Sequence, residues 1–261
     1  MSAMLDIIGS KLVSLKATQF NGVDEYAYID NPSFKTDTQG ACAFWMKLPS
    51  VLASTGSLGI LAYGAYEAGN NAGITLFQRY NGDTTINATY RNKPILDIFT
   101  RETHNGTIYR AYGNHILTTS TWAHVVVQSN GSSYSYYVNG VNAGGTSWFG
   151  SANNGAWLGD ISGSIHRLSI AARPFENSII SHCPQTIDEL LYFNRPLTSG
   201  ESTWLYNGGT PRNPLRGGFG SDLKSFWRMG ESRDSATTIY DEIGSNNLTL
   251  VNMDASNYVT S

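Results

Sequence analysis

The 261-residue sequence has few charged residues and no long hydrophobic run. Only 14% of its residues are Asp, Glu, Lys or Arg, against about 25% in an ordinary soluble protein. The net charge of −3 gives no electrostatic reason to expect nucleic acid as a partner. No stretch of 18 apolar residues is present, so we expect no membrane span. The first residues also lack the basic, apolar and small-residue regions of a secretory signal.

Cysteine is scarce as well. The two cysteines, Cys42 and Cys183, match no metal-binding spacing. Two alternatives stay open for them: a disulfide between neighbouring strands, or two buried thiols, since free cysteine is among the most buried residue types.

Apolar and small polar residues are abundant instead. Hydrophobic residues make up 41% of the chain, which excludes intrinsic disorder. Ser, Thr and Asn together account for 73 of the 261 residues, and 27 more are glycine. A chain of this composition can bury a core and make many tight turns.

Helical periodicity is missing from most of the chain, and short segments of period two replace it. They are rich in β-branched and aromatic residues and lie at 26–29, 43–46, 73–77, 85–90, 124–127, 134–138 and 187–193. Asn-Gly pairs, which favour tight hairpin turns, stand at 21–22, 81–82, 105–106, 130–131, 139–140 and 154–155. The sequence therefore predicts an all-β fold, a two-sheet antiparallel jelly-roll sandwich.

One short helix is predicted after residue 198. Thr198 and Glu201 have the spacing of a capping box, and Asn207 followed by Gly208 is a typical helix end. A helix of about two turns is not stable alone, so we expect it to dock on the sheet through Trp204 and Leu205.

The composition divides the chain into three parts. We expect an N-terminal arm over residues 1–14, the jelly-roll domain over 15–208, and a C-terminal extension over 209–261 that packs on the sandwich. A segment of this length is marginal for independent folding without a metal or disulfide.

Motifs in a fixed order carry a family resemblance. They are Phe20-Asn-Gly-Val-Asp24, Phe44-Trp45, Trp122-Ala-His124, Tyr137-Val-Asn-Gly140, Ile187-Asp-Glu189 and Arg195-Pro-Leu-Thr-Ser-Gly-Glu201. Together they resemble the laminin-G-like jelly roll of the concanavalin A-like lectin/glucanase superfamily. The later segments Phe226-Trp-Arg-Met-Gly-Glu231 and Asn247-Leu-Thr-Leu-Val251 are similar to tails that follow this domain in tailed-bacteriophage structural proteins.

The resemblance raises the question of catalysis. Glycosidases of this superfamily carry closely spaced carboxylates on one strand face. Here the acidic pairs, among them Asp188-Glu189, are adjacent, and adjacent residues on a strand point to opposite faces. No other catalytic motif is found. We therefore expect a protein that is not an enzyme.

A glycan-binding loop is one candidate site. Trp148 and Trp157 flank a segment rich in glycine and asparagine that contains Asn153 and Asn154. Aromatic rings beside amide groups are suited to holding sugars, although packing of a turn explains the same residues. His124, in an apolar strand, is expected to be a half-buried structural residue.

A calcium ion is the other candidate, and it is implied by the resemblance. Related jelly rolls often hold one structural Ca²⁺ through an aspartate on a late strand, a position that Asp188 matches. The Asp24 carboxylate and a backbone carbonyl near Gly22 would complete a shell of hard oxygen ligands. The alternative is that Asp188 caps backbone amides at the edge of the sheet.

The resemblance also implies the function class. We expect a non-enzymatic structural or accessory protein of a virion, with a lectin-like domain for surface adhesion or glycan binding on a phage capsid or tail. Its partners would be other virion proteins and cell-surface glycans, in an oligomer or an assembled particle. The alternatives are an extracellular carbohydrate-binding module, secreted or on the cell surface, and a glycoside hydrolase of the same superfamily.

Overall fold

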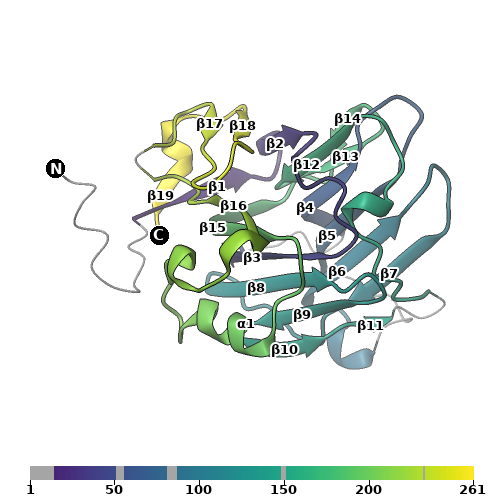
Figure 1. Cartoon of the computed structure of the whole chain (residues 1–261), viewed down its shortest axis with the longest axis horizontal. Helices are drawn as coiled ribbons and strands as arrows, with labels where there is room; N and C mark the ends of the chain where they lie inside the picture. The colour runs from purple at the N-terminus through teal and green to yellow at the C-terminus, as the bar shows by residue number, and fades with distance from the viewer. Residues whose placement is uncertain (1–14, 51–55, 81–86, 148–150, 232) are drawn as a thin grey trace.

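Two large antiparallel sheets packed face to face form the body of the protein (Figure 1). The computed structural model describes residues 15–50, 56–80, 87–147, 151–231 and 233–261. The expected arm at 1–14 lies outside the described residues. The two sheets confirm the all-β sandwich that the period-two segments predict.

The first sheet has eight strands. In spatial order they are β10 (Val141–Gly144), β9 (Tyr134–Val138), β8 (Trp122–Ser129), β3 (Gly40–Lys47), β15 (Pro184–Phe193), β1 (Lys16–Asn21) and β19 (Tyr258–Thr260), and β16 (Leu223–Trp227) pairs with a part of β15.

The second sheet has nine strands. In order they are β11 (Thr146–Ser147), β7 (Ile108–Tyr112), β6 (Pro94–Arg101), β5 (Gly73–Tyr80), β4 (Gly56–Ala65), β12 (His166–Ile170), β2 (Tyr26–Asp30), β18 (Leu248–Val251) and β17 (Thr238–Ile239). A separate hairpin of β13 (Arg173–Phe175) and β14 (Ser178–Ile180) follows β12 directly and packs against β4, β5 and β12. Short 3-10 turns cover Ala88–Tyr90, Leu158–Asp160, Pro214–Arg216, Gly220–Asp222 and Ala255–Asn257.

The core fills the space between the sheets. Alternate residues of each strand enter it, for example Val125 and Val127 of β8 and Leu96 and Ile98 of β6, and all of them are buried. Residues with the opposite orientation on the eight-stranded sheet meet a second apolar layer. Helix α1 (Ser199–Tyr206) and the segment 214–223 cover that side, with Leu205 and Phe219 packed against Val126 and Phe193.

Helix α1 has the predicted ends. The Thr198 side chain accepts a hydrogen bond from the backbone N–H of Glu201, and the Glu201 carboxylate accepts one from the backbone N–H of Thr198. Asn207 closes the helix with a φ of 46°. Both ends confirm the sequence prediction.

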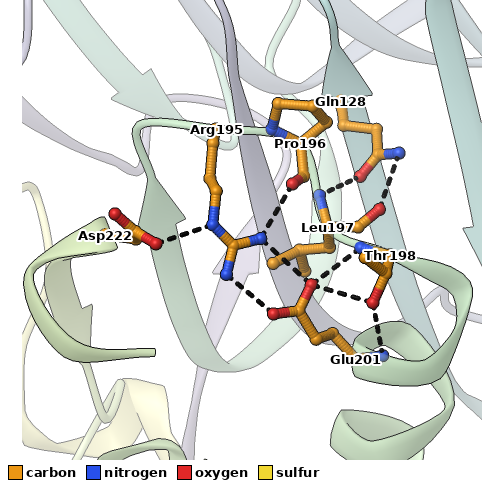
Figure 2. Close-up of polar contacts among 7 residues, drawn as sticks. All are labelled: Gln128, Arg195, Pro196, Leu197, Thr198, Glu201 and Asp222. Atoms are coloured by element: carbon orange, nitrogen blue, oxygen red, sulfur yellow. Dashed lines mark hydrogen bonds and ion pairs between the residues drawn. The ribbon is translucent and has the colours of Figure 1, made fainter. Parts of the chain in front are cut away.

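Arg195 ties the helix to the segment that follows it (Figure 2). Its guanidinium donates to both oxygens of Glu201, at 3.0 and 2.7 Å, and to Asp222 at 2.7 Å. The side chain of Gln128, on β8, accepts from the backbone N–H of Leu197 at 2.8 Å. These bonds attach the start of the helix to both the sheet and the 220–222 turn.

Asn-Gly pairs play more than one role. Asn139 and Gly140 both have positive φ, 51° and 74°, and form the tight turn between β9 and β10 as expected. The pair at 21–22 does not make a hairpin, because β1 and β2 belong to different sheets. Gly22 lies so close to Pro184 that a Cβ there would be 2.4 Å from the proline ring. Asn81-Gly82 lies outside the described residues.

The C-terminal extension is part of the sandwich rather than a layer laid on it. Its strands join both sheets, with β16 and β19 in the first and β17 and β18 in the second. Figure 1 shows this segment in yellow and green beside β1 and β2. Trp227 is 1% exposed, and its indole N–H donates to the carbonyl of Asn246. The extension therefore supplies core residues to the domain.

The two cysteines are free thiols, which resolves the alternative left open by the sequence. In the part of the chain that the structure describes, no helix is long and apolar enough to cross a membrane.

Candidate functional site

The aromatic loop predicted as a sugar platform is folded inward. Trp157 is 3% exposed, and its indole N–H donates to the Tyr192 hydroxyl at 3.0 Å inside the core. A buried ring cannot stack on a sugar, so Trp157 does not fit the predicted role. Trp148 lies outside the described residues.

The asparagines of the same loop are engaged by the protein. Asn153 accepts from the backbone N–H of Tyr134 at 2.6 Å and donates to the carbonyls of Tyr134 and Gly145. Asn154 donates to the carboxylate of Glu102 at 2.5 Å. These bonds hold the loop against β9, which favours the packing alternative.

The residues predicted to bind calcium do not come together. Gly22 lies against Pro184, which pairs with Asn21, whereas Asp188 is four residues farther along β15, about 13 Å away. The Asp24 carboxylate accepts from the Asn21 and Asn252 amides, while Asp188 accepts from the Ser261 hydroxyl at 2.7 Å. Among the described residues, no group of three or more His, Cys, Asp and Glu could hold a metal ion. These three residues therefore do not fit one calcium site.

A bulge in β15 also overturns the expected alternation around Asp188. Glu189 has a φ of 50°, and the register with β3 shifts between Asp188 and Leu191. Both Asp188 and Glu189 are buried, and Glu189 lies 3.7 Å from the guanidinium of Arg228, whereas Asp188 accepts from the Ser261 hydroxyl. Regular alternation therefore does not hold at this pair.

His124 is a structural residue, as the sequence predicts, but it is more deeply buried than expected. Its ring packs beside those of Trp45, with ring centres 5.2 Å apart, and Tyr206, at 6.5 Å, and these two rings stack on each other at 5.9 Å. Burial lowers the pKa of His124 to about 3, so the ring is neutral at pH 7.

Half-buried aromatic and charged side chains gather on the outer face of the nine-stranded sheet, the side turned away from the core, and the small residues between them are buried. Tyr63, Ile74, Ile98 and Leu168 point into the core, so their strand neighbours point outward. Pairing across four strands puts Arg167, Gly64, Gly73 and Arg101 in one row. The next row contains Tyr28, Ser169, Ala62, Thr75 and Phe99.

One end of these rows is a tyrosine–arginine cluster. The guanidinium of Arg167 lies over the rings of Tyr28, at 3.8 Å, and Tyr66, at 3.6 Å. It also donates two hydrogen bonds to the Asp30 carboxylate, at 2.7 and 2.8 Å. Tyr26 extends the cluster, with its ring centre 5.9 Å from that of Tyr28. The three tyrosines are half-buried and Asp30 is exposed.

The other end is a phenylalanine–arginine cluster. Arg173, from the β13–β14 hairpin, lies 4.8 Å from the ring centre of Phe99, 5.2 Å from that of Phe175 and 5.9 Å from that of Phe77. Arg101 lies 5.8 Å from the ring of Phe99. Burial and the charge of Arg101 lower the pKa of Arg173 to about 10, so Arg173 remains cationic at pH 7.

Small residues separate the two clusters. Gly64 and Gly73 lie between Arg167 and Arg101, and Ala62 and Thr75 lie between Tyr28 and Phe99. Three strand spacings separate Arg167 from Arg101, which places their backbones about 14 Å apart. Half-exposed rings packed beside fixed hydrogen-bonding groups are suited to a ligand with both apolar and polar faces.

A family comparison agrees with the fold. Residues 21–201, more than half of the chain, match the family Laminin_G_3, described as the concanavalin A-like lectin/glucanases superfamily. A search of curated proteins finds no match.

Solved structures show the same architecture at low sequence identity. The CBM40 of the Ruminococcus gnavus IT-sialidase bound to α2,3-sialyllactose is 14% identical, with a TM-score of 0.55, and the match covers 76% of this chain and 100% of that one. A structure from Bacteroides ovatus, provisionally described as a carbohydrate binding protein, is 14% identical with a TM-score of 0.60, and the match covers 96% of this chain and 60% of that one. A K499G mutant of the NanB sialidase from Streptococcus pneumoniae is 15% identical (0.52; 93% and 39%). These similarities show the fold alone.

The sequence contains a signal for the outer face. Tyr26, Tyr28 and Asp30 alternate with the apolar Ala27 and Ile29, and Asp97, Phe99 and Arg101 alternate with Ile98 and Thr100. Alternation of this kind predicts an aromatic and charged outward face for each strand. It does not predict that the two strands share a sheet.

Proposed function

The chain belongs to the concanavalin A-like lectin/glucanase superfamily, and from that premise we propose that it is a non-enzymatic carbohydrate-binding module that uses the outer face of its nine-stranded sheet. The observation that carries the proposal is the tyrosine–arginine cluster. Two half-buried tyrosine rings, Tyr28 and Tyr66, lie against Arg167, whose position is fixed by two hydrogen bonds to Asp30, and the ring of Tyr26 lies beside that of Tyr28.

This cluster has the chemistry that a sugar requires. Ring faces pack against the C–H groups of a pyranose, and fixed polar groups bond its hydroxyls. The Arg167–Asp30 pair holds its own geometry, so little side-chain freedom is lost when a ligand binds. A CBM40 of the same fold is bound to α2,3-sialyllactose, which adds support for a glycan ligand.

Glycan binding by matched variants tests the proposal. Tyr28→Ala and Tyr66→Ala each remove one ring beside Arg167, and we expect each to weaken glycan binding at least tenfold on an array and in calorimetry. Trp122→Ala is the matched control, because Trp122 is a half-buried ring under Lys47, at 4.8 Å, on the other sheet. Unchanged binding by both tyrosine variants would contradict the assignment of the site, and hydrolysis of a bound glycan would contradict the non-enzymatic role.

We place this module on a virion, where it would mediate adhesion. The support is the resemblance of segment 226–231 to tails of phage structural proteins; an extracellular module is the alternative. The test is the protein composition of purified particles. Detection of this chain at a fixed copy number supports the placement, and its absence from particles contradicts it without affecting the glycan-binding proposal.

A further inference from the structure

We infer that Arg101 and Arg173 form a subsite for the carboxylate of an acidic sugar. This inference rests on the proposed function, since it names the class of glycan that the outer face would select.

Several guanidinium groups of the protein meet a carboxylate: Arg167 is paired with Asp30, Arg110 with Asp97, and Arg195 with Glu201 and Asp222. Within the part of the chain that the structure describes, the side chains of Arg101 and Arg173 have no ion pair or hydrogen bond, and the Nε of Arg101 is buried. The guanidinium of Arg212 has no such partner either, so what sets Arg101 and Arg173 apart is that both lie against the ring of Phe99.

The surroundings of Arg101 and Arg173 make two neighbouring guanidinium groups destabilising for the folded protein when no anion is bound. Arg173 is flanked by the rings of Phe77, Phe99 and Phe175, which replace water without supplying a hydrogen-bond acceptor. Arg101 adds a like charge, which lowers the pKa of Arg173 together with burial. Partly buried charges that are not compensated destabilise the folded state. An anion placed between the two groups would remove both the repulsion and the missing hydrogen bonds.

The geometry favours a carboxylate on a sugar over a simple ion. Guanidinium groups bond carboxylates through two parallel N–H donors. The half-buried ring of Phe99 lies beside both arginines, at 4.8 and 5.8 Å, and offers an apolar surface next to the charges. The nearby carboxylate of Asp97 is already neutralised by Arg110 at 2.6 Å, so it does not compete for the subsite.

The position of the subsite fits a larger ligand. Arg101 shares a row with Arg167, three strands away, with only Gly64 and Gly73 between them. No large side chain of that row therefore separates the tyrosine–arginine cluster from Arg101.

The test compares acidic and neutral glycans. 3′-Sialyllactose and an oligogalacturonide are the acidic probes, which differ in the source of the carboxylate, and lactose is the neutral probe. We expect at least one acidic probe to bind the wild-type protein at least tenfold more tightly than lactose. Arg101→Gln and Arg173→Gln should each remove most of that difference and leave lactose binding unchanged.

Controls separate the subsite from the fold and from the general site. Arg212→Gln is the matched control, because Arg212 also lies over an aromatic ring, 4.9 Å from the ring centre of Trp204, on helix α1 beside the eight-stranded sheet. If a Gln variant fails to fold, Arg173→Lys keeps the charge, loses the paired donors and should still weaken binding of the acidic probe. Equal affinity for acidic and neutral probes, or an acidic preference that survives both Gln variants, would overturn the inference while the glycan-binding proposal stands. No binding of any glycan would overturn both.

Discussion

Acidification should destabilise the protein through His124. The ring is 2% exposed and packs beside the rings of Trp45 and Tyr206, and no hydrogen bond to its Nδ1 is found among the described residues. Protonation there would place a charge in an apolar layer, which is why burial lowers the pKa of His124 from 6.5 to about 3.

Proton linkage gives the sign and the size of the change in the free energy of unfolding. Between pH 6.5 and about 3 the unfolded chain binds a proton at His124 that the native protein does not bind, so the free energy of unfolding falls as the pH falls. One proton corresponds to about 1.4 kcal/mol per pH unit. From pH 7 to pH 5 the loss is about 2 kcal/mol, and it hardly changes if the native pKa lies anywhere below about 4.

Urea denaturation between pH 7 and pH 5 measures this loss, in a range where most carboxylates stay ionised. His124→Gln cannot titrate, so its free energy of unfolding should fall by about 2 kcal/mol less than that of the wild type over the same range. His104→Gln, at an exposed histidine, is the control and should retain the wild-type dependence. Parallel curves for the wild type and His124→Gln would refute the argument.

Three further predictions concern the fold. Deletion of residues 209–261 removes β16 to β19 and the buried Trp227, so we expect no cooperative thermal transition by calorimetry; a normal transition would show that the extension is dispensable. Thr198→Ala should lower the free energy of unfolding by about 1 kcal/mol in urea, with Thr198→Ser close to the wild type, because the hydroxyl accepts the Glu201 N–H. Burial raises the pKa of Cys42 to about 12 and that of Cys183 further still, so neither thiol should react with a thiol reagent at pH 8 until guanidinium unfolds the chain, and rapid labelling of the native protein would contradict this.

Local patterns in the sequence predicted the features that depend on neighbouring residues. The capping box of α1 needs only the side chains and backbone N–H groups of Thr198 and Glu201. The turn at Asn139-Gly140 needs only two residues that tolerate positive φ. In both cases the partners are a few residues apart, so the sequence contains the whole interaction.

Predictions that needed a partner far along the chain were less successful. Trp157 stands in a polar, glycine-rich segment, as an exposed platform would, yet its indole bonds Tyr192, 35 residues away, on β15. The expected alternation of Asp188 and Glu189 required β15 to run regularly, and a bulge at Glu189 interrupts it. Nothing in the residues near either position reveals these contacts.

The outer face of the nine-stranded sheet depends most on contacts between residues that are far apart in the sequence. Its two rows combine residues from β2, β12, β4, β5 and β6, in an order that the chain does not follow. Alternation assigns Tyr28 and Phe99 to outward faces, but their common row exists only because Ser169, Ala62 and Thr75 are paired between them. Arg173 reaches Phe99 from a hairpin outside the sheet, and no spacing in the sequence relates the two residues. A site assembled across strands in this way is determined by strand order and register, so it becomes visible only when the sheet has been built.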